Sequence, residues 1–212
     1  MEEKELEIVF VRHAQSRQNI GETAPGFHPD DAPLTELGLR QAALLAKRFS
    51  PGELDAIYAG TLIRTCQTVQ PTAEKLGLPI RVVPELMEVG TAVCGTSLSH
   101  VEALAPAALE SAREVLPARR TYSLANESET HCAERAQTVL ALLQSLHPGG
   151  AKILVATHGA FFGYLVRGAL GLSLPEPFAW EVSNCAVTDV RFCSHDKPRL
   201  VCSNDQRHFY MV

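Results

Sequence analysis

The sequence predicts an α/β fold class, a three-layer α/β/α sandwich with a mostly parallel central sheet and a helical lid insertion. One reason is that runs of β-forming residues alternate with helix-like runs, which is the pattern of parallel strands joined by crossover helices. Another is that two of the β-forming runs stop at a histidine, His13 and His158. A buried parallel strand delivers a functional side chain to its carboxyl edge in this way.

The individual elements follow from local composition and punctuation. We expect strands at 6–11, 56–59, 80–83, 153–157 and 185–192. We expect helices at 35–49, 62–76, 129–146 and 160–170. Thr35 and Thr61 are the predicted N-caps of the first two helices, because a hydroxyl can accept from the first free N–H groups. Gly77 and Gly171 are the predicted stops of the second and fourth helices.

A single domain spanning residues 1–212 is the simplest organisation. The chain has 212 residues, of which 46% are hydrophobic, and this is enough for one full core. Residues 89–126 interrupt the strand–helix alternation directly after Glu88 and include an Ala-rich stretch. A long connection in such a place is often a substrate lid, so we expect a helical lid insertion at 89–126.

The composition indicates which classes of partner and which cellular compartment to expect. The net charge of −5 argues against nucleic acid as a partner, because a nucleic-acid-binding protein usually carries a basic face. No stretch approaches the roughly 18 apolar residues that a membrane span needs, so we expect no membrane partner. The charged start of the chain lacks the apolar segment of a secretory signal. We therefore expect a cytoplasmic protein whose six cysteines are reduced thiols.

The residues at the ends of these runs predict phosphate chemistry. Arg12 directly precedes His13, and Arg64 stands at the start of a predicted helix. An arginine gives a phosphate bidentate contacts and a permanent charge. An imidazole nitrogen is nucleophilic near neutral pH and can carry a phosphoryl group. We therefore predict that Arg12 and Arg64 bind the phosphate, and that His13 is the nucleophile of a phosphohistidine intermediate.

Residues 11–16 (Val-Arg-His-Ala-Gln-Ser), with Asn19 shortly after them, resemble the Arg-His-Gly signature of the histidine phosphatase superfamily, the phosphoglycerate-mutase-like enzymes. Further stretches resemble motifs of that family in the family's order, namely 34–42, 62–68, 86–88, 127–128, 158–159 and Asn184. These matches span nearly the whole chain. The resemblance implies the fold described above and an enzyme that acts on a phosphate ester.

The resemblance also places the proton donor of the reaction at Glu88, in the Leu-x-Glu pattern of 86–88. Such a carboxyl must be protonated part of the time, so a low-dielectric or anion-adjacent setting is expected. Glu85 is the competing assignment. It follows Pro84 at a strand end, where a solvated turn residue is ordinary, and we therefore prefer Glu88.

The remaining site residues are expected to contact the phosphate oxygens. His158, if protonated, would stabilise the transition state by its charge and hydrogen bonds. The backbone N–H of Gly159 lies at a predicted helix start, where anions bind readily. Asn19 is expected to add a neutral donor. No step of this chemistry calls for a metal or for any other cofactor.

Three functions are compatible with these residues, and a metal-independent phosphatase that hydrolyses a phosphomonoester is the preferred one. A cofactor-dependent phosphoglycerate mutase is an alternative, but residues 89–100 lack the aromatic and the Lys that the resemblance associates with mutases shortly after the acid. Arg119 and Arg120 could bind a second anion or could be exposed. A catalytically silent phosphate-binding module is the third option, because Ala14 replaces the usual Gly of the signature, at a cost if the backbone there needs positive φ.

The expected partner is a small phosphorylated substrate. Its identity, and whether it is a metabolite or a phosphoprotein, cannot be read from the motifs. The oligomeric state is equally open, with a homodimer as one option.

Overall fold

The structure is a computed structural model that describes residues 5–91, 109–110, 126–172, 180–193 and 197–210. Its strands are β1 (Leu6–Arg12), β2 (Ala56–Ala59), β3 (Ile80–Val82), β4 (Leu109–Glu110), β5 (Ala151–Thr157), β6 (Val187–Phe192) and β7 (Arg199–Asp205). Its α-helices are α1 (Glu36–Lys47), α2 (Ile63–Leu76), α4 (Glu129–Leu146) and α5 (Gly159–Ala169). Short 3-10 turns are η1 (Arg17–Ile20), η2 (Pro29–Asp31), η3 (Pro84–Leu86) and η5 (Arg207–Tyr210).

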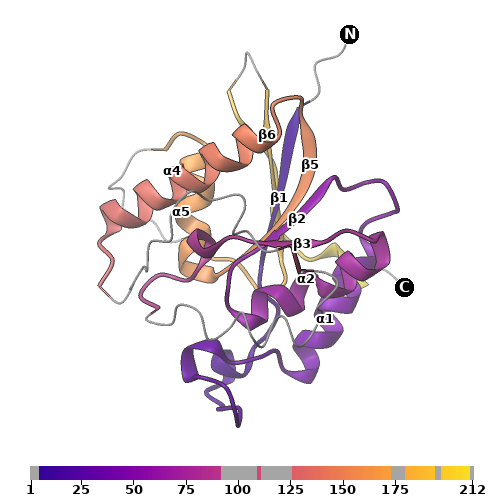
Figure 1. The fold of residues 1–212 in the computed structure, drawn as a ribbon, viewed down its shortest axis with the longest axis vertical. Helices are drawn as coiled ribbons and strands as arrows, with labels where there is room; N and C mark the ends of the chain where they lie inside the picture. Colours follow the sequence, from indigo (N-terminus) through magenta and orange to yellow (C-terminus); the bar gives the residue numbers. More distant parts are fainter. Residues whose placement is uncertain (1–4, 92–108, 111–125, 173–179, 194–196, 211–212) are drawn as a thin grey trace.

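Within the described residues the strands form one seven-stranded sheet in the order β4-β3-β2-β5-β1-β6-β7. The pairs from β4 to β1 are parallel, whereas β6 pairs antiparallel with both β1 and β7. Helices α4 and α5 pack together over one face, and α1 and α2 pack together over the other (Figure 1). The predicted three-layer sandwich with a mostly parallel sheet is therefore confirmed.

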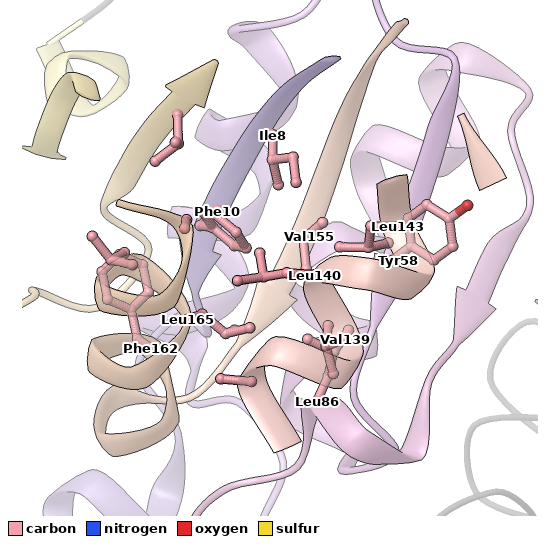
Figure 2. Packing of buried hydrophobic residues seen from close by; sticks show 14 of the residues in the cluster. Ile8, Phe10, Tyr58, Leu86, Val139, Leu140, Leu143, Val155, Phe162 and Leu165 are labelled. Carbon is pink, nitrogen blue, oxygen red and sulfur yellow. The ribbon is translucent and has the colours of Figure 1, made fainter. Parts of the chain in front are cut away.

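Two apolar clusters, one on each face of the sheet, hold the layers together. Successive side chains of a strand point to opposite faces. Ile8 and Phe10 of β1 accordingly join the cluster under α4 and α5. Val9 and Val11 join the cluster under α1 and α2. In the first cluster the ring of Phe10 meets that of Phe162 edge to face, with centroids 6.3 Å apart (Figure 2). Burial of each such side chain contributes about 1.5–3 kcal/mol to the stability of the fold, so the central strands are held firmly between the two helical layers.

The expected strands and helices are all present, with ends shifted by at most two residues. Thr35 is the N-cap of α1, and its hydroxyl accepts from the N–H of Gly38, as predicted. Gly77 ends α2 in the left-handed conformation, at φ 66°. Gly171 also has positive φ, one residue beyond the C-cap of α5.

The prediction that Thr61 caps α2 is wrong. The N-cap is Leu62, which makes no side-chain capping bond. The carboxylate of Asp31 in η2 takes over this role, because its Oδ1 accepts from the N–H of Ile63 at 2.8 Å. Asp31 is buried, so a charged side chain distant in sequence replaces the local hydroxyl.

Most of the predicted lid at 89–126 lies outside the described residues. The described part of it includes β4, which pairs in parallel with β3 and so adds a short strand where a helical insertion was expected. None of the helices in the described ranges is long and apolar enough to cross a membrane. The described cysteines are free thiols, buried at Cys66, Cys132 and Cys185 and partly buried at Cys193 and Cys202.

Candidate active site

The two predicted histidines meet at one edge of the sheet. Strands β1 and β5 pair in parallel with Arg12 opposite Thr157, so the next residue of each, His13 and His158, reaches the same edge. The N–H of His13 donates to the carbonyl of Thr157 at 2.9 Å and extends the ladder by one bond. Both rings are buried, and their centroids are 5.2 Å apart. The register of two central strands therefore fixes the spacing of the two imidazoles.

The imidazole of His13 is held in one tautomer by the adjacent peptide. Its Nδ1 lies 2.8 Å from the carbonyl oxygen of Ala14. A carbonyl oxygen only accepts, so Nδ1 carries the proton and Nε2 of the neutral ring carries the lone pair. Burial lowers the pKa of His13 well below 6.5, and the charges of Arg64 and Arg12 lower it further. At neutral pH the ring is therefore uncharged, with its nucleophilic nitrogen free.

Arg64 brings a buried cation into the site from the first turn of α2. Its side chain is 2% exposed, and its Nη1 donates to the carbonyl of Asp30 at 2.6 Å. Burial lowers the pKa of Arg64 to about 10, against the opposing charges of Glu88, Asp31 and Asp30. The guanidinium is still charged at pH 7, and its Nε has no partner among the described residues. A buried cation with an unused donor is suited to an anionic ligand.

Arg12 supplies a second guanidinium from the end of β1. Its Nη1 donates to the carbonyl of Val182 at 2.6 Å, and its buried Nε has no partner among the described residues. The first residue of α5, Gly159, lies against this group, and a Cβ there would come 3.2 Å from Nε of Arg12. Glycine at this position therefore leaves the arginine room beside the helix start.

Glu88 lies against the N-terminus of α5. Its Oε1 accepts from the N–H of Phe161 at 3.0 Å, and its Oε2 accepts from the N–H of Ala160 at 3.3 Å. Oε1 also accepts from the N–H of the following residue. The charge of Glu88 partly offsets the lowering of pKa at both Arg12 and Arg64, so the carboxylate shares their pocket. This helix end favours a negative charge.

Glu85, the competing candidate, has different surroundings. Burial raises its pKa, and the cation that acts on it in the opposite direction is Arg135. Its Oε2 is buried without a partner among the described residues. The two arginines beside His13 interact with Glu88 and not with Glu85 in this way. Glu88, and not Glu85, therefore lies beside the arginines of the site.

His158 stands directly before α5 with both ring nitrogens buried. Neither nitrogen has a hydrogen-bond partner in the described part of the chain. Burial lowers the pKa of His158 well below 6.5, and the charge of Arg64 acts in the same direction. The unliganded site thus disfavours the protonated form that we considered from the sequence. A cationic His158 requires an anion beside it.

Asn19 and Asn184 connect η1 to the backbone of His13 at the end of β1. Oδ1 of Asn19 accepts from both the N–H and the hydroxyl of Ser16, at 3.0 and 3.1 Å. It also accepts from Nδ2 of Asn184 at 3.1 Å, and that Nδ2 donates in addition to the carbonyl of His13 at 3.0 Å. The oxygen of Asn19 is fully engaged, so the amide NH₂ is the part of this side chain left for a ligand.

Ala14 is accommodated without the strain considered above. Its φ is not positive, so a side chain is tolerated at this position of the signature. Its N–H donates to Oγ1 of Thr68 at 2.9 Å, and the hydroxyl of Thr68 donates to the carbonyl of Arg64 at 2.6 Å. One hydroxyl therefore connects the residue after His13 to the helix that carries Arg64.

Residues of the motif at 34–42 pack against the backbone of Gln15, two residues after His13. Gly38 of α1 lies so close to the loop that a Cβ would be 2.0 Å from the carbonyl oxygen of Gln15. Oε1 of Gln41 accepts from the N–H of Gln15 at 2.9 Å. The glycine and the glutamine thus act on backbone geometry next to the nucleophile.

Sequence reasoning missed Arg135 and Thr157, whose side chains donate to the turn that carries Glu88, and the pairing of Arg135 with Glu127 of the motif at 127–128. Arg135 lies on the buried face of α4 with Cys132 and Val139, three residues before it and four after it. A charged residue at an apolar helical position is the signal that could have found it, because an arginine is almost never buried without a partner.

Some predictions lie outside the described residues. Arg119 and Arg120 do, as does most of the lid at 89–126, and their roles remain predictions. Within the described ranges no group of three or more His, Cys, Asp or Glu side chains is placed to hold a metal ion.

Known proteins resemble this chain in sequence and in fold. The chain is 28% identical over 188 residues to a probable phosphoglycerate mutase, GpmB, of Yersinia pestis (strain Pestoides F), covering 88% of this chain and 85% of that one. Its fold is similar to that of a phosphoserine phosphatase mutant from Entamoeba histolytica in complex with phosphoserine, with a TM-score of 0.68, 19% identity and 96% and 98% of the two chains covered. It is also similar to a mycobacterial glucosyl-3-phosphoglycerate phosphatase, with a TM-score of 0.66, 25% identity and 95% and 100% coverage.

A family model matches nearly the whole chain, and this match shows the family. The model of the histidine phosphatase superfamily (branch 1) matches residues 8–206. This range contains every residue of the site described above, from Arg12 to Asn184. The chain therefore belongs to the histidine phosphatase superfamily (branch 1).

Proposed function

We propose that this protein is a metal-independent phosphatase that hydrolyses a small phosphomonoester through a phosphohistidine on His13. The observation that carries the proposal is the bond from Nδ1 of His13 to the carbonyl of Ala14. It leaves Nε2 as a neutral nucleophile in a buried pocket that also contains two guanidinium groups with unused donors, Arg12 and Arg64. These cations supply the charge that phosphoryl transfer requires.

In the first step Nε2 of His13 attacks phosphorus while the bond from phosphorus to the ester oxygen breaks. The leaving oxygen takes a proton from the carboxyl of Glu88, so an alcohol departs and the carboxylate remains. Donors from Arg12, Arg64, His158, Asn19 and the N–H of Gly159 contact the phosphoryl oxygens. The carbonyl of Ala14 accepts from Nδ1 throughout and so stabilises the positive charge that the phosphorylated ring acquires.

In the second step the Glu88 carboxylate takes a proton from water, and the water oxygen attacks phosphorus. The bond to Nε2 breaks, which releases inorganic phosphate and restores His13. The three N–H groups around Glu88 hold its carboxylate at the N-terminus of α5, where the water of this step must lie.

A phosphoglycerate mutase is the second candidate, because the Yersinia relative carries the name of a probable mutase. A mutase returns the phosphoryl group from His13 to a second hydroxyl instead of to water. Two of the structures with a similar fold are named as phosphatases, of phosphoserine and of glucosyl-3-phosphoglycerate. The absence of an aromatic and a Lys from residues 89–100 of the sequence also favours the phosphatase.

Phosphate release from a panel of phosphomonoesters separates these functions. The panel contains phosphoserine, 3-phosphoglycerate, sugar phosphates and a phosphotyrosine peptide, each with a chelator present. The proposal expects release that the chelator does not change and that His13→Ala abolishes. Conversion of 3-phosphoglycerate to 2-phosphoglycerate that depends on 2,3-bisphosphoglycerate, with little release, would establish the mutase instead. Tight phosphate binding without either reaction would indicate a silent binding module.

A further inference from the structure

The turn that carries Glu88 is held by its carbonyl groups. This turn, η3 and the residue after it, presents three successive carbonyl oxygens, and a buried side chain donates to each of them. Nη1 of Arg135 donates to the carbonyls of Glu85 and Met87, at 2.6 and 2.9 Å. The hydroxyl of Thr157 donates to the carbonyl of Leu86 at 3.0 Å. The backbone directly before the acid therefore has no freedom to rotate without losing a buried hydrogen bond.

Arg135 is itself fixed by a second residue, Glu127. Its Nε and Nη2 donate to Oε1 and Oε2 of Glu127, each at 2.7 Å, which is a bidentate pair. The side chains of the pair are 3% and 0% exposed. Because the pair uses one edge of the guanidinium, the remaining Nη1 is aimed at the turn.

The guanidinium of Arg135 also contacts the first turn of α5, whose N–H groups bind the carboxylate of Glu88. Its Cζ lies 3.6 Å from the ring centroid of Phe161, in a cation–π contact. The N–H of Phe161 donates to Oε1 of Glu88 at 3.0 Å. Arg135 therefore contacts both the turn before the acid and the helix end that binds its carboxylate.

We infer that Arg135, oriented by Glu127, is a positioning residue that sets where the Glu88 carboxyl lies relative to the leaving oxygen of the substrate. The inference rests on the proposed role of Glu88 as proton donor. It assigns the function to the planar fork of arginine and not to its charge alone, because one donor edge must engage Glu127 while Nη1 reaches two carbonyls. A lysine retains the charge but cannot make these contacts together.

A purely structural ion pair would have other consequences. Replacement of a buried ion pair by apolar groups is often neutral for stability, whereas removal of one partner is costly. A loss of stability in an Arg135 variant thus cannot distinguish the two roles. Dependence on the leaving group can, because a proton donor matters for a poor leaving group and hardly at all for a good one.

The test compares kcat/KM for an activated aryl phosphate with kcat/KM for an alkyl phosphate, because this parameter reports the transfer to His13 and not the later hydrolysis of the phosphohistidine, in which Glu88 also acts. The enzymes are the wild type, Arg135→Lys, Arg135→Met, Glu127→Gln and Glu88→Gln. Leu143→Ala, a core change two turns further along α4, is the control for lost stability. General acid catalysis contributes roughly 10²–10⁴-fold, so Glu88→Gln should lose about that factor on the alkyl ester and much less on the aryl ester.

The inference expects the Arg135 variants and Glu127→Gln to show the same selective loss, at least about 10-fold greater on the alkyl ester. Leu143→Ala should leave the ratio of the two rates unchanged. Equal losses on both esters in the Arg135 variants, with a selective loss in Glu88→Gln, would overturn the positioning role while the proton donor stands. If Glu88→Gln shows no selectivity either, the proposed donor fails and the positioning role fails with it. Should Arg135→Met not fold, Arg135→Lys and Glu127→Gln carry the same comparison.

Discussion

The carbonyl oxygen of Ala14 accepts a hydrogen bond from Nδ1 of His13 at 2.8 Å, and this contact determines which nitrogen of the ring can react. The bond requires the proton on Nδ1, so the lone pair is on Nε2. Burial and the two neighbouring arginines keep the ring neutral, because they lower its pKa well below 6.5. The backbone of one residue thus fixes the tautomer of His13 and leaves Nε2 as the nitrogen that the proposed mechanism uses.

Replacing the nucleophile should abolish turnover. His13→Ala is expected to lower kcat/KM for an aryl phosphate by more than about 10³-fold, because no other side chain replaces a missing covalent nucleophile. His147→Gln is the control, since this half-buried histidine bonds to the hydroxyl of Tyr58 and belongs to no step of the reaction. Steady-state phosphate release checks both. Comparable activity in His13→Ala and the wild type would contradict the assignment.

The hydroxyl of Thr68 should matter more than its methyl group. Thr68→Val leaves the buried N–H of Ala14 without an acceptor, so the free energy of unfolding should fall by about 1–3 kcal/mol and kcat should fall with it. Thr68→Ser keeps the acceptor and should retain most of the activity. Thr72→Val is the matched control, because the buried hydroxyl of Thr72 has no partner among the described residues. Urea unfolding that ranks Thr72→Val as the more damaging change would contradict this account.

The close approach of α1 to the nucleophile loop should make Gly38 sensitive to a methyl group. Gly38→Ala would place Cβ 2.0 Å from the carbonyl oxygen of Gln15, so the loop or the helix must move. Overpacking of this kind typically costs about 1–3 kcal/mol. Gly149→Ala, where a Cβ meets nothing within 4 Å, should be nearly neutral. Thermal melting and kcat of the two variants provide the comparison, and equal effects would argue against the packing seen here.

Acid should destabilise the protein through its buried histidines. The pKa values of His13 and His158 are lowered chiefly by burial, so below about pH 6.5 the unfolded chain binds protons that the folded chain does not. Their contribution to stability is complete above that pH and is lost as the pH falls. Asp189 acts in the opposite direction, because burial raises its pKa to about 6 and its protonated form favours the folded state at lower pH.

Urea unfolding at pH 7.5 and pH 5.0 measures this linkage. The Asp189→Asn background removes one of the two opposing carboxyls, the other being Glu85, whose pKa burial also raises. In that background the free energy of unfolding should be lower at pH 5.0. Adding His158→Gln should reduce the difference between the two pH values. A protein that is more stable at pH 5.0 in the Asp189→Asn background would contradict buried, neutral histidines.

The sequence predicts the position of a site residue where that residue stands directly after a strand or at the start of a helix. The β-forming runs that stop at His13 and His158 predict parallel strands with a histidine at the carboxyl edge, and the parallel register of Arg12 opposite Thr157 bears this out. Arg64 was also predictable, because it stands in the first turn of a helix that follows a strand. These features depend on local pattern and on the general behaviour of parallel sheets.

Features that depend on distant contacts could not be read in this way. Asp31 caps α2 across the fold in place of Thr61, and no local spacing connects the two. Strand β7 was missed because it lies at the sheet edge with exposed Leu200 and Val201, so it lacks the alternation of a half-buried strand. The role of Arg135 depends on two carbonyl oxygens, those of Glu85 and Met87, which lie 50 and 48 residues earlier in the sequence.

The most direct test of the central claim is to trap the phosphorylated enzyme. The protein is mixed with an excess of labelled aryl phosphate, quenched in base within the first turnover, digested and analysed for the modified residue. The account predicts an acid-labile, base-stable phosphohistidine on His13, attached at Nε2, which forms and decays fast enough to lie on the path to phosphate release. Turnover without any such intermediate, or attachment at Nδ1 or on another residue, would contradict it.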